Sequence, residues 1–386
     1  MFHKLNVVFL VCAGRAGGGF LQSMLDSHPE IVMLPMEFKF QANWLKYCQG
    51  KNLDLNTMVD TWTKKTKISL FNEGILYGVE ANKDFTNCNI EDFKKHLIQI
   101  LKRDGLSKQN VFYGLHEAYA KSIGQNLKLV KMIIEFCARS IIIDEAINDF
   151  PGAKFIEVAR DPRANYMSSK NQMLLVNTNL IIGNKYKFSS LLIKILKDLY
   201  VDYQSMRNNP VSRIKNKWLI IRHEEMHFNN SMVVHNLTKW LGVSNHPSLY
   251  KSTLGGHEWS GNSSTGKAVV GVSPDVVSRW ESEIGLEEKR LIELIFSNVF
   301  SYYSYSLTAP LKKLSMRELL RPIKGEFSTR IKRHKPSNPL LIKIWNLNPL
   351  LVFTGRFIFF NLVLASFFYC QARVWLFNHF RRNKVS

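Results

Sequence analysis

Two hydrophobic periods alternate along most of the chain. Short continuous apolar runs, typical of strands buried on both faces of a parallel sheet, occur at residues 5–12, 31–34, 154–159 and 218–221. Apolar residues recur at helical spacing over residues 20–27, much of 40–125, the segment around 164–167, 186–206, a segment ending near 241, and 274–297. Strands that alternate with helices in this way predict an α/β fold, with a P-loop-type parallel β-sheet flanked by helices.

The pattern changes after about residue 305. Residues 311–386 contain 15 Lys and Arg but only two acidic residues, so they account for most of the formal net charge of +21. Within them, the apolar run 350–370 is interrupted by Arg356; it is short for a spanning helix but suits a helix lying on an anionic membrane surface. A helical cap on the domain or on a partner is the alternative. We therefore expect an α/β domain over residues 1–305 and a helical, basic, partly apolar C-terminal extension over residues 306–386.

The excess of basic residues indicates an anionic partner, such as a nucleotide, an acidic glycan, a nucleic acid or a membrane surface. The five cysteines form no Cys-x-x-Cys pair and have no metal-ligand spacing, which favours a reducing compartment over a disulfide framework. Lys4 and the apolar run 5–12 could pass for the start of a signal peptide, but the run is short and leads straight into a glycine-rich loop. These features predict a cytoplasmic protein, with peripheral attachment to the inner face of a membrane through the extension.

A glycine-rich segment connects the first predicted strand to the first predicted helix. It reads GRAGGGF over residues 14–20 and is called the glycine loop below. Such a loop exposes backbone N–H groups and the positive end of a helix dipole to a phosphate, and Arg15 adds a planar cation suited to phosphate or sulfate oxygens. An ATPase loop would end in Gly-Lys-Ser/Thr to reach magnesium, whereas Phe20 follows Gly19 here. The sequence therefore predicts an anion-binding loop without a magnesium ligand, and it offers no clustered metal ligands.

Residues 14–31, reading GRAGGGFLQSMLDSHPEI, resemble the donor-binding loop of the carbohydrate and tyrosyl-protein branches of the sulfotransferases. The resemblance implies a metal-free site for the sulfuryl donor 3′-phosphoadenosine 5′-phosphosulfate (PAPS), with Arg15 at the 5′-phosphosulfate. The hydroxyl residues of the family fall at Gly18 and Gly19 here, and Ala16 replaces a common serine. The donor-binding residues implied in this loop are Gly14, Arg15, Ala16, Gly17, Gly18, Gly19 and Phe20.

A second motif, KFIEVARDPRANYMSS, spans residues 154–169. Arg160 follows a predicted strand, at the end where α/β sheets bind ligands, and Ser168 comes eight residues later. A purely structural interpretation is that Asp161 caps the following helix and that Arg160 pairs with a nearby carboxylate. The sulfotransferases have a similar Arg-Asp/Asn-Pro-Arg/Lys run with a serine eight residues after the first Arg. This resemblance implies that Arg160 and Ser168 bind the 3′-phosphate of PAPS.

Sulfuryl transfer needs a general base to take the proton of the acceptor. Glu37 follows the second predicted strand, close to the glycine loop, and resembles the base of the tyrosyl-protein and some bacterial branches; an ordinary surface or capping glutamate is the alternative. Glu37 and Arg15 are the predicted catalytic residues, and His116, after the strand-like run 111–113, is the rival base. Lys131 is a weaker candidate for a substrate-side cation. Lys267, in a predicted loop over residues 255–273, is a further candidate at the donor.

Together these motifs predict an enzyme, a PAPS-dependent sulfotransferase acting on a hydroxyl or amine, with a carbohydrate or glycolipid as the favoured acceptor. Two alternatives stay open. A P-loop nucleotide kinase or NTPase is disfavoured by the missing Gly-Lys-Ser/Thr, and a non-catalytic nucleotide- or glycan-binding module attached to a membrane would fit the absent loop hydroxyls. No nucleic-acid partner is expected.

Overall fold

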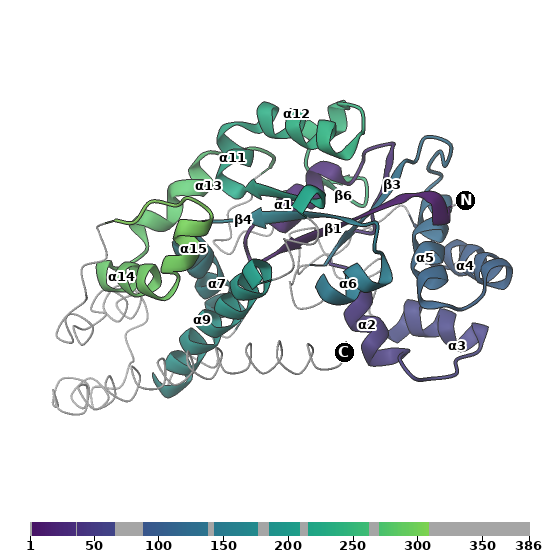
Figure 1. Ribbon diagram of the computed structural model, residues 1–386, viewed down its shortest axis with the longest axis horizontal. Coiled ribbons are helices and arrows are strands. Elements are labelled where there is room, and N and C mark those ends of the chain that lie inside the picture. Colours follow the sequence, from purple (N-terminus) through teal and green to yellow (C-terminus); the bar gives the residue numbers. More distant parts are fainter. Residues whose placement is uncertain are drawn as a thin grey trace, which may run out of the picture. The chain divides into compact units, whose positions relative to one another are not determined.

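The computed structural model describes residues 2–35, 37–65, 88–137, 143–176, 185–208, 215–261 and 270–308 (Figure 1). Within these residues the chain forms two compact units. The first consists of Met1–Arg160 with Met206–Val277, and the second of Asp161–Ser205 with the chain from Ser278 onward. The apolar run 350–370, most of the predicted extension and Lys267 lie outside the described residues.

The first unit is built on a five-stranded sheet in which every neighbouring pair of strands is parallel. This arrangement confirms the predicted α/β fold class. The order of the strands is β2-β3-β1-β4-β5, and their bounds are β1 Asn6–Cys12, β2 Ile31–Val32, β3 Met132–Phe136, β4 Lys154–Ala159 and β5 Trp218–Arg222. The chain leaves β1 toward β2 on one side and leaves β4 toward β5 on the other. The carboxyl ends of β1 and β4 are therefore the topological switch point, where open α/β sheets bind ligands.

Four of the five strands were predicted from their apolar runs, and β3 was not. Its sequence, Met-Ile-Ile-Glu-Phe, is fully buried, yet the charged Glu135 within it and Lys131 just before it break the apolar run. Burial raises the pKa of the Glu135 carboxyl to about 8, and its Oε1 accepts a hydrogen bond of 2.8 Å from the backbone N–H of Phe40. β3 pairs with β1, with Met132 opposite Asn6, so it completes the central part of the sheet.

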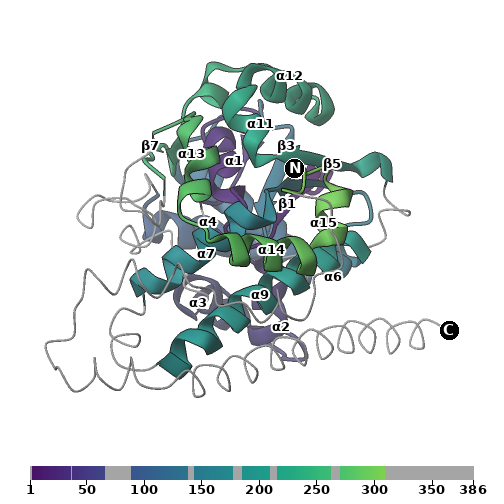
Figure 2. The ribbon, with the colours of Figure 1, turned by 90° about the vertical axis from the view of Figure 1, so that its left-hand side faces the viewer.

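Helices cover both faces of this sheet. In Figures 1 and 2, α11 and α12 lie on one side of it, and α2, α3 and α6 lie on the other. The helical segments of the first unit are η1 Phe2–Lys4, α1 Gly18–Leu25, α2 Phe40–Tyr47, α3 Leu55–Asp60, η2 Thr61–Lys65, α4 Ile90–Asp104, α5 Lys108–Ser122, α6 Ile143–Asp149, η5 Lys215–Lys217, α11 His223–Phe228, α12 Asn230–Leu241 and η6 Pro247–Tyr250. The ring of Phe9 in β1 stacks on that of Phe155 in β4, with 5.4 Å between the ring centroids. Phe112 and Phe150 also pack on the ring of Phe9. This aromatic cluster is the centre of the core.

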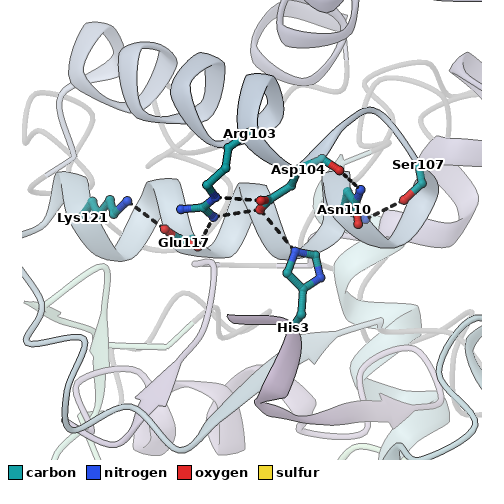
Figure 3. A network of polar contacts seen from close by, with 7 residues as sticks. All are labelled: His3, Arg103, Asp104, Ser107, Asn110, Glu117 and Lys121. Carbon is teal, nitrogen blue, oxygen red and sulfur yellow. Dashed lines mark hydrogen bonds and ion pairs between the residues drawn. The ribbon is translucent and has the colours of Figure 1, made fainter. Parts of the chain in front are cut away.

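A polar network fastens the α4–α5 pair to the start of the chain (Figure 3). The Arg103 guanidinium donates to Asp104 at 2.7 Å and to Glu117 of α5 at 3.3 Å, and Glu117 also pairs with Lys121 at 2.7 Å. His3, just before β1, contacts Asp104 at 3.2 Å. The Arg103 guanidinium holds the pKa of Asp104 down at about 2. The network therefore positions the amino end of β1, opposite the edge at which the glycine loop lies.

The second unit is helical in its described part. Its segments are α7 Pro162–Val176, α9 Lys185–Asn208 (whose last residues belong to the first unit), η7 Arg279–Ser282, α14 Leu286–Ile295 and α15 Ser297–Tyr302. Buried charges are paired within it. Arg163 contacts Glu293 at 2.6 Å, and Glu288 accepts hydrogen bonds from Tyr166 at 2.7 Å and Lys170 at 3.1 Å. Each buried carboxylate therefore has a partner, as burial of a charge requires.

Two predicted helices and one predicted loop differ from the structure. The helix predicted to end near residue 241 is two helices, α11 and α12, separated at Asn229. The helix predicted over residues 274–297 is broken into α13 Asp275–Ser278, η7 and α14, with Gly285 in an extended conformation before α14. The predicted loop 255–273 begins within an antiparallel hairpin of β6 Thr253–Leu254 and β7 His257–Glu258. Helical periodicity continues across such interruptions, so it does not reveal them.

Candidate functional site

The glycine loop crosses from the carboxyl end of β1 to the first turn of α1. The N–H of Ala16 donates to the carbonyl of Ala13, and the N–H groups of Phe20 and Leu21 donate to the carbonyl of Gly17. Gly17 is the N-cap of α1 and has no side chain to cap the helix. The N–H groups of Gly18 and Gly19, the first two residues of α1, precede the first hydrogen bonds of the helix, and the helix dipole adds positive potential there. The loop is therefore built to receive an anion.

Two glycines of the loop are required by their surroundings. Gly17 has φ +102°, and a Cβ at this position would stand 2.3 Å from Nδ1 of His223. A Cβ on Gly18 would stand 2.7 Å from Sγ of Cys12 and 2.7 Å from the ring of Phe136. At Gly19, by contrast, the nearest atom to a Cβ is a ring carbon of Trp259, at 3.6 Å. Packing therefore excludes a hydroxyl-bearing side chain at residue 18 but leaves room for one at residue 19.

Two predicted arginines meet at the switch point. Arg160 follows β4, and its Nη1 donates a hydrogen bond of 3.0 Å to the backbone carbonyl of Arg15. Burial, and then the positive charge of Arg160, lower the pKa of Arg15 to about 10, while the negative charge of Glu37 acts in the opposite direction. Arg15 also has φ 66°, a left-handed conformation that side-chain-bearing residues seldom adopt. The loop thus holds two cations close together, an arrangement that an anion between them would stabilise.

Two histidines that the sequence analysis missed stand beside the same loop. His223, directly after β5, and His227, one turn later in α11, are each 4% exposed. Their rings contact each other at 4.7 Å, and the ring of Phe20 stacks on that of His227 at 4.6 Å with an angle of 12°. α1 and α11 lie side by side in both views (Figures 1 and 2). The spacing His-x-x-x-His after a strand was the available pattern; alone, it is also common on ordinary buried helix faces.

The predicted base, Glu37, lies near the glycine loop, close enough for its negative charge to act on the pKa of Arg15. Its carboxylate forms an ion pair of 2.6 Å with Lys39, and the Glu37 side chain is 34% exposed. It is therefore accessible to an acceptor from solvent. Lys39 would have to share or release this carboxylate when an acceptor binds.

The rival base and the predicted substrate-side lysine lie elsewhere. His116 does not follow a strand, because residues 108–122 form helix α5; its ring is fully buried between Phe112 and Phe38, and its Nδ1 donates to the carbonyl of Phe112 at 2.8 Å. Lys131 precedes β3, at the amino edge of the sheet, and pairs with Glu30 at 2.9 Å. Lys131 is therefore at the opposite edge of the sheet from the glycine loop, and His116, which packs against Phe38, next to Glu37, is fully buried.

The second half of the first motif is structural. The carboxylate of Asp26 accepts hydrogen bonds from the N–H groups of Gly255 and Gly256, at 3.0 and 2.9 Å, and so holds the β6–β7 turn. His28 donates from Nε2 to the carbonyl of Ser244 at 3.0 Å and accepts from the N–H of Glu30 at its Nδ1. These contacts anchor the end of α1 and fix the orientation of the glycine loop at its other end.

The second motif is divided between the two units. Asp161 accepts a hydrogen bond from the N–H of Arg163 at 2.8 Å, which confirms its capping role, and also binds the Arg163 guanidinium at 2.6 Å. Ser168 lies in α7 of the second unit, so its pairing with Arg160 stays a prediction. In the neighbouring strand β5, Nε1 of Trp218 donates a hydrogen bond of 2.8 Å to the buried carboxylate of Glu157 in β4.

Neither metal ligation nor membrane insertion has support in the described residues. Within them, no three His, Cys, Asp or Glu side chains are grouped as metal ligands. None of the helices in the described part of the chain has the length and apolar character needed to cross a membrane.

Comparison with known proteins identifies the family of this chain. Residues 7–247 match the model of the sulfotransferase family, and this match covers more than half of the chain and includes both motifs. The chain therefore belongs to the sulfotransferase family. No similar sequence was found among curated proteins.

Solved structures of sulfotransferases are similar to the chain at low sequence identity. The sulfotransferase domain of the curacin biosynthetic pathway has 15% identity and a TM-score of 0.47, over 78% of this chain and 99% of that one. The sulfotransferase domain of the Synechococcus PCC 7002 olefin synthase has 15% identity and a TM-score of 0.46, over 78% and 96%. A sulfotransferase from Mycobacterium avium has 10% identity and a TM-score of 0.41, over 79% and 78%.

Proposed function

We propose that this sulfotransferase uses PAPS as its donor and transfers the sulfuryl group to an acceptor hydroxyl or amine. The observation that carries the proposal is the meeting of Arg15 and Arg160 at the uncapped start of α1, at the switch point of the sheet. A site with two cations and an uncapped helix start favours a ligand with several negative charges, as the donor has. The membership of the chain in the sulfotransferase family supports the same assignment.

The proposal gives each predicted site residue a role. The N–H groups of the glycine loop and the guanidinium of Arg15 bind the 5′-phosphosulfate, and Arg160, together with Ser168, binds the 3′-phosphate. Phe20 offers an aromatic face to the adenine, and Lys267 is a further cation for the donor. During transfer, the acceptor oxygen bonds to sulfur, the bond from sulfur to the bridging oxygen breaks, and adenosine 3′,5′-bisphosphate leaves. Arg15 and the loop amides stabilise the charge that develops on these oxygens.

Glu37 is the proposed general base. Its side chain is exposed enough to meet an acceptor, and it lies near enough to Arg15 to act on the pKa of that guanidinium. In the reaction its carboxylate receives the proton of the acceptor as the new bond to sulfur forms.

The acceptor is proposed as a carbohydrate or a glycolipid. The basic residues 311–386 and the apolar run 350–370 favour an acceptor at an anionic membrane surface, to which the extension would attach the enzyme. The competing functions make different demands. A nucleotide kinase or NTPase requires ATP and magnesium, and a non-catalytic module binds a nucleotide or a glycan without transfer.

Calorimetric titration with adenosine 3′,5′-bisphosphate, beside ATP with magnesium, tests the donor site. We expect micromolar affinity for the bisphosphate, much weaker binding of ATP, and a loss of about 100-fold in Arg160→Ala, which removes a charge-assisted contact. Arg103→Ala is the matched control, because it removes a guanidinium from α4, in the network of Figure 3, and should leave the affinity unchanged. A wild-type protein that does not bind the bisphosphate would contradict the proposal.

The same preparation separates an enzyme from a binding module. Glu37→Gln should bind the bisphosphate as the wild type does, but transfer labelled sulfate from PAPS to a panel of sugars and glycolipids about 10²–10³-fold more slowly. Equal transfer rates in Glu37→Gln and wild type would remove Glu37 from the mechanism. Bisphosphate binding without transfer to any acceptor would favour the module.

A further inference from the structure

The histidine pair beside the glycine loop is unusual for buried polar groups. Among the described residues, no hydrogen-bond partner lies at either nitrogen of His223 or at Nε2 of His227, although both rings are almost fully buried. Only Nδ1 of His227 is satisfied, by the N–H of Ser273 at 3.0 Å. Buried polar atoms in folded proteins are nearly always paired, so unpaired ones need an explanation.

The unpaired nitrogens of this pair adjoin the proposed anion site. Nδ1 of His223 lies beside Gly17, the N-cap of α1, so closely that a Cβ there would stand 2.3 Å away. Arg160 acts electrostatically on both rings. The loop itself offers no hydroxyl, since its side chains are those of Arg15, Ala16 and glycines. His223, directly after β5, therefore brings a polar side chain to this loop, as Arg160 does directly after the neighbouring strand β4.

The same surroundings keep the pair neutral in the free protein. Burial lowers the pKa of His223 well below its usual value, and the nearby charges of Arg160 and protonated His227 add to this effect. Burial, and then Arg160, lower the pKa of His227 to about 4. From the elements packed on the pair, Phe20 contributes an uncharged ring and Ser273 a backbone N–H. Arg160 is thus the charge that opposes protonation, and it is also a proposed ligand of the donor.

We infer that His223 and His227 form a protonatable pair within the donor site, and that a phosphate or sulfate group bound at the glycine loop places one solvent proton on this pair, which then donates a hydrogen bond to the anion. The inference rests on the proposed function. A bound dianion offsets the positive charge of Arg160, which otherwise disfavours the protonated form of the pair. The dianion also provides a hydrogen-bond acceptor for that form. The proton goes to His223, whose two nitrogens have no partner, because a proton on Nδ1 of His227 would displace the hydrogen bond from the N–H of Ser273.

The sign of the pH dependence follows from this exchange. Free protein has a neutral pair at neutral pH and the complex a protonated one, so binding takes up a proton. Affinity is therefore greatest at low pH and falls as the pH rises through the pKa of the pair in the complex. The donor is held more tightly in acid although the arginines keep their charge throughout this range.

The test is calorimetric titration with adenosine 3′,5′-bisphosphate and, separately, with sodium sulfate, in buffers of different ionisation enthalpy from about pH 5.5 to about pH 8.5. Sulfate stays a dianion over this range, so a pH-dependent affinity for sulfate reports protein groups alone. For the bisphosphate we expect uptake approaching one proton and an affinity about tenfold weaker at pH 8 than at pH 6. The double variant His223→Gln/His227→Gln should lose the sulfate pH dependence, and His235→Gln, at an exposed position on α12, should keep it.

The outcomes distinguish this inference from the proposed function. If the wild type binds the bisphosphate but the double variant has the same pH profile, the inference is wrong and the donor site stands. If the wild type does not bind the bisphosphate, the proposed function fails and the inference with it. Should the double variant not fold, ¹⁵N spectra of the histidine rings in the wild type still decide. A ring pKa that does not rise on adding bisphosphate overturns the proposal.

Discussion

Two sets of buried histidines occupy opposite kinds of environment in the first unit. His116 is enclosed by the aromatic rings of Phe112 and Phe38, and its Nδ1 donates to a carbonyl of its own helix. His223 and His227 lie at the carboxyl edge of the sheet, against the glycine loop and under the influence of Arg160. Burial lowers the pKa of His116 to about 4, as it does for His227. A low pKa is therefore common to a core histidine and to a candidate ligand.

The neighbours of each set, and not the burial, separate them. Around His116 the structure supplies aromatic packing, with no charge among the causes of its pKa shift. Around His223 it supplies an uncapped helix start and two arginines that together favour a multiply charged ligand. A perturbed titratable group thus indicates a site only when other groups converge on the same point. This reasoning argues against His116 as the base, and Glu37 stays the proposed one.

The largest expected effect is that of Gly17→Ala, which brings a methyl group against His223. The change combines a positive φ with a Cβ contact of 2.3 Å, so we expect it to cost about 3 kcal/mol of folding stability, and bisphosphate binding to be lost. Gly50→Ala is the matched control, because Gly50 also has a positive φ, of +71°, but nothing within 4 Å of a Cβ. Urea unfolding should show only about 1 kcal/mol for the control. An equal loss of folding stability in both variants would mean that His223 moves away from the added methyl group without destabilising the fold.

The next effect concerns the pH dependence of stability, and it comes from His116. Its pKa is lower in the folded chain than in the unfolded one, so its contribution is complete above about pH 6.5 and is lost as the pH falls toward about 4. Between pH 7 and pH 5 this loss amounts to about 2 kcal/mol. Urea unfolding of His116→Gln should show a pH dependence that is smaller by that amount, while proton uptake on bisphosphate binding stays unchanged. A change in proton uptake would show that the two sets of histidines are coupled.

Much of the fold and of the site could be predicted from the sequence because the relevant residues are local. A buried parallel strand is a short apolar run, and the glycine loop, Arg160 and Asp161 lie next to such runs. β3 was not predicted because Glu135 interrupts its apolar run. Burial favours the neutral form of this carboxyl by raising its pKa to about 8, and its Oε1 accepts a hydrogen bond from the N–H of Phe40, which is far away in the sequence. The helix breaks near residues 229 and 285 were not predicted because the helical spacing of apolar residues continues across them.

The part of the site that was missed depends on contacts between distant segments. His223 is about 200 residues from Gly17, and no local pattern shows that its ring enters the space left by that glycine. The same contact is a reason for glycine at residue 17 that adds to its positive φ of +102°. In the same way, only the packing of Cys12 and Phe136 shows why residue 18 cannot carry the hydroxyl that the family has there.

The smallest expected effect is a gain in affinity from Gly19→Ser, which sharpens the contrast between the two neighbouring glycines. A Cβ at residue 19 has its nearest neighbour at 3.6 Å, so a serine fits, and its hydroxyl would lie in the first turn of α1 with a bound anion. One added hydrogen bond is worth about 1 kcal/mol, so the affinity for bisphosphate should rise about fivefold. Gly18→Ser is the matched counterpart: it should weaken stability, because its Cβ would stand 2.7 Å from Cys12 and from Phe136. Calorimetry measures the affinity of both variants for the bisphosphate, and thermal unfolding measures their stability. An unchanged affinity in Gly19→Ser would mean that His223, and not a loop hydroxyl, already supplies the contact that the glycines lack.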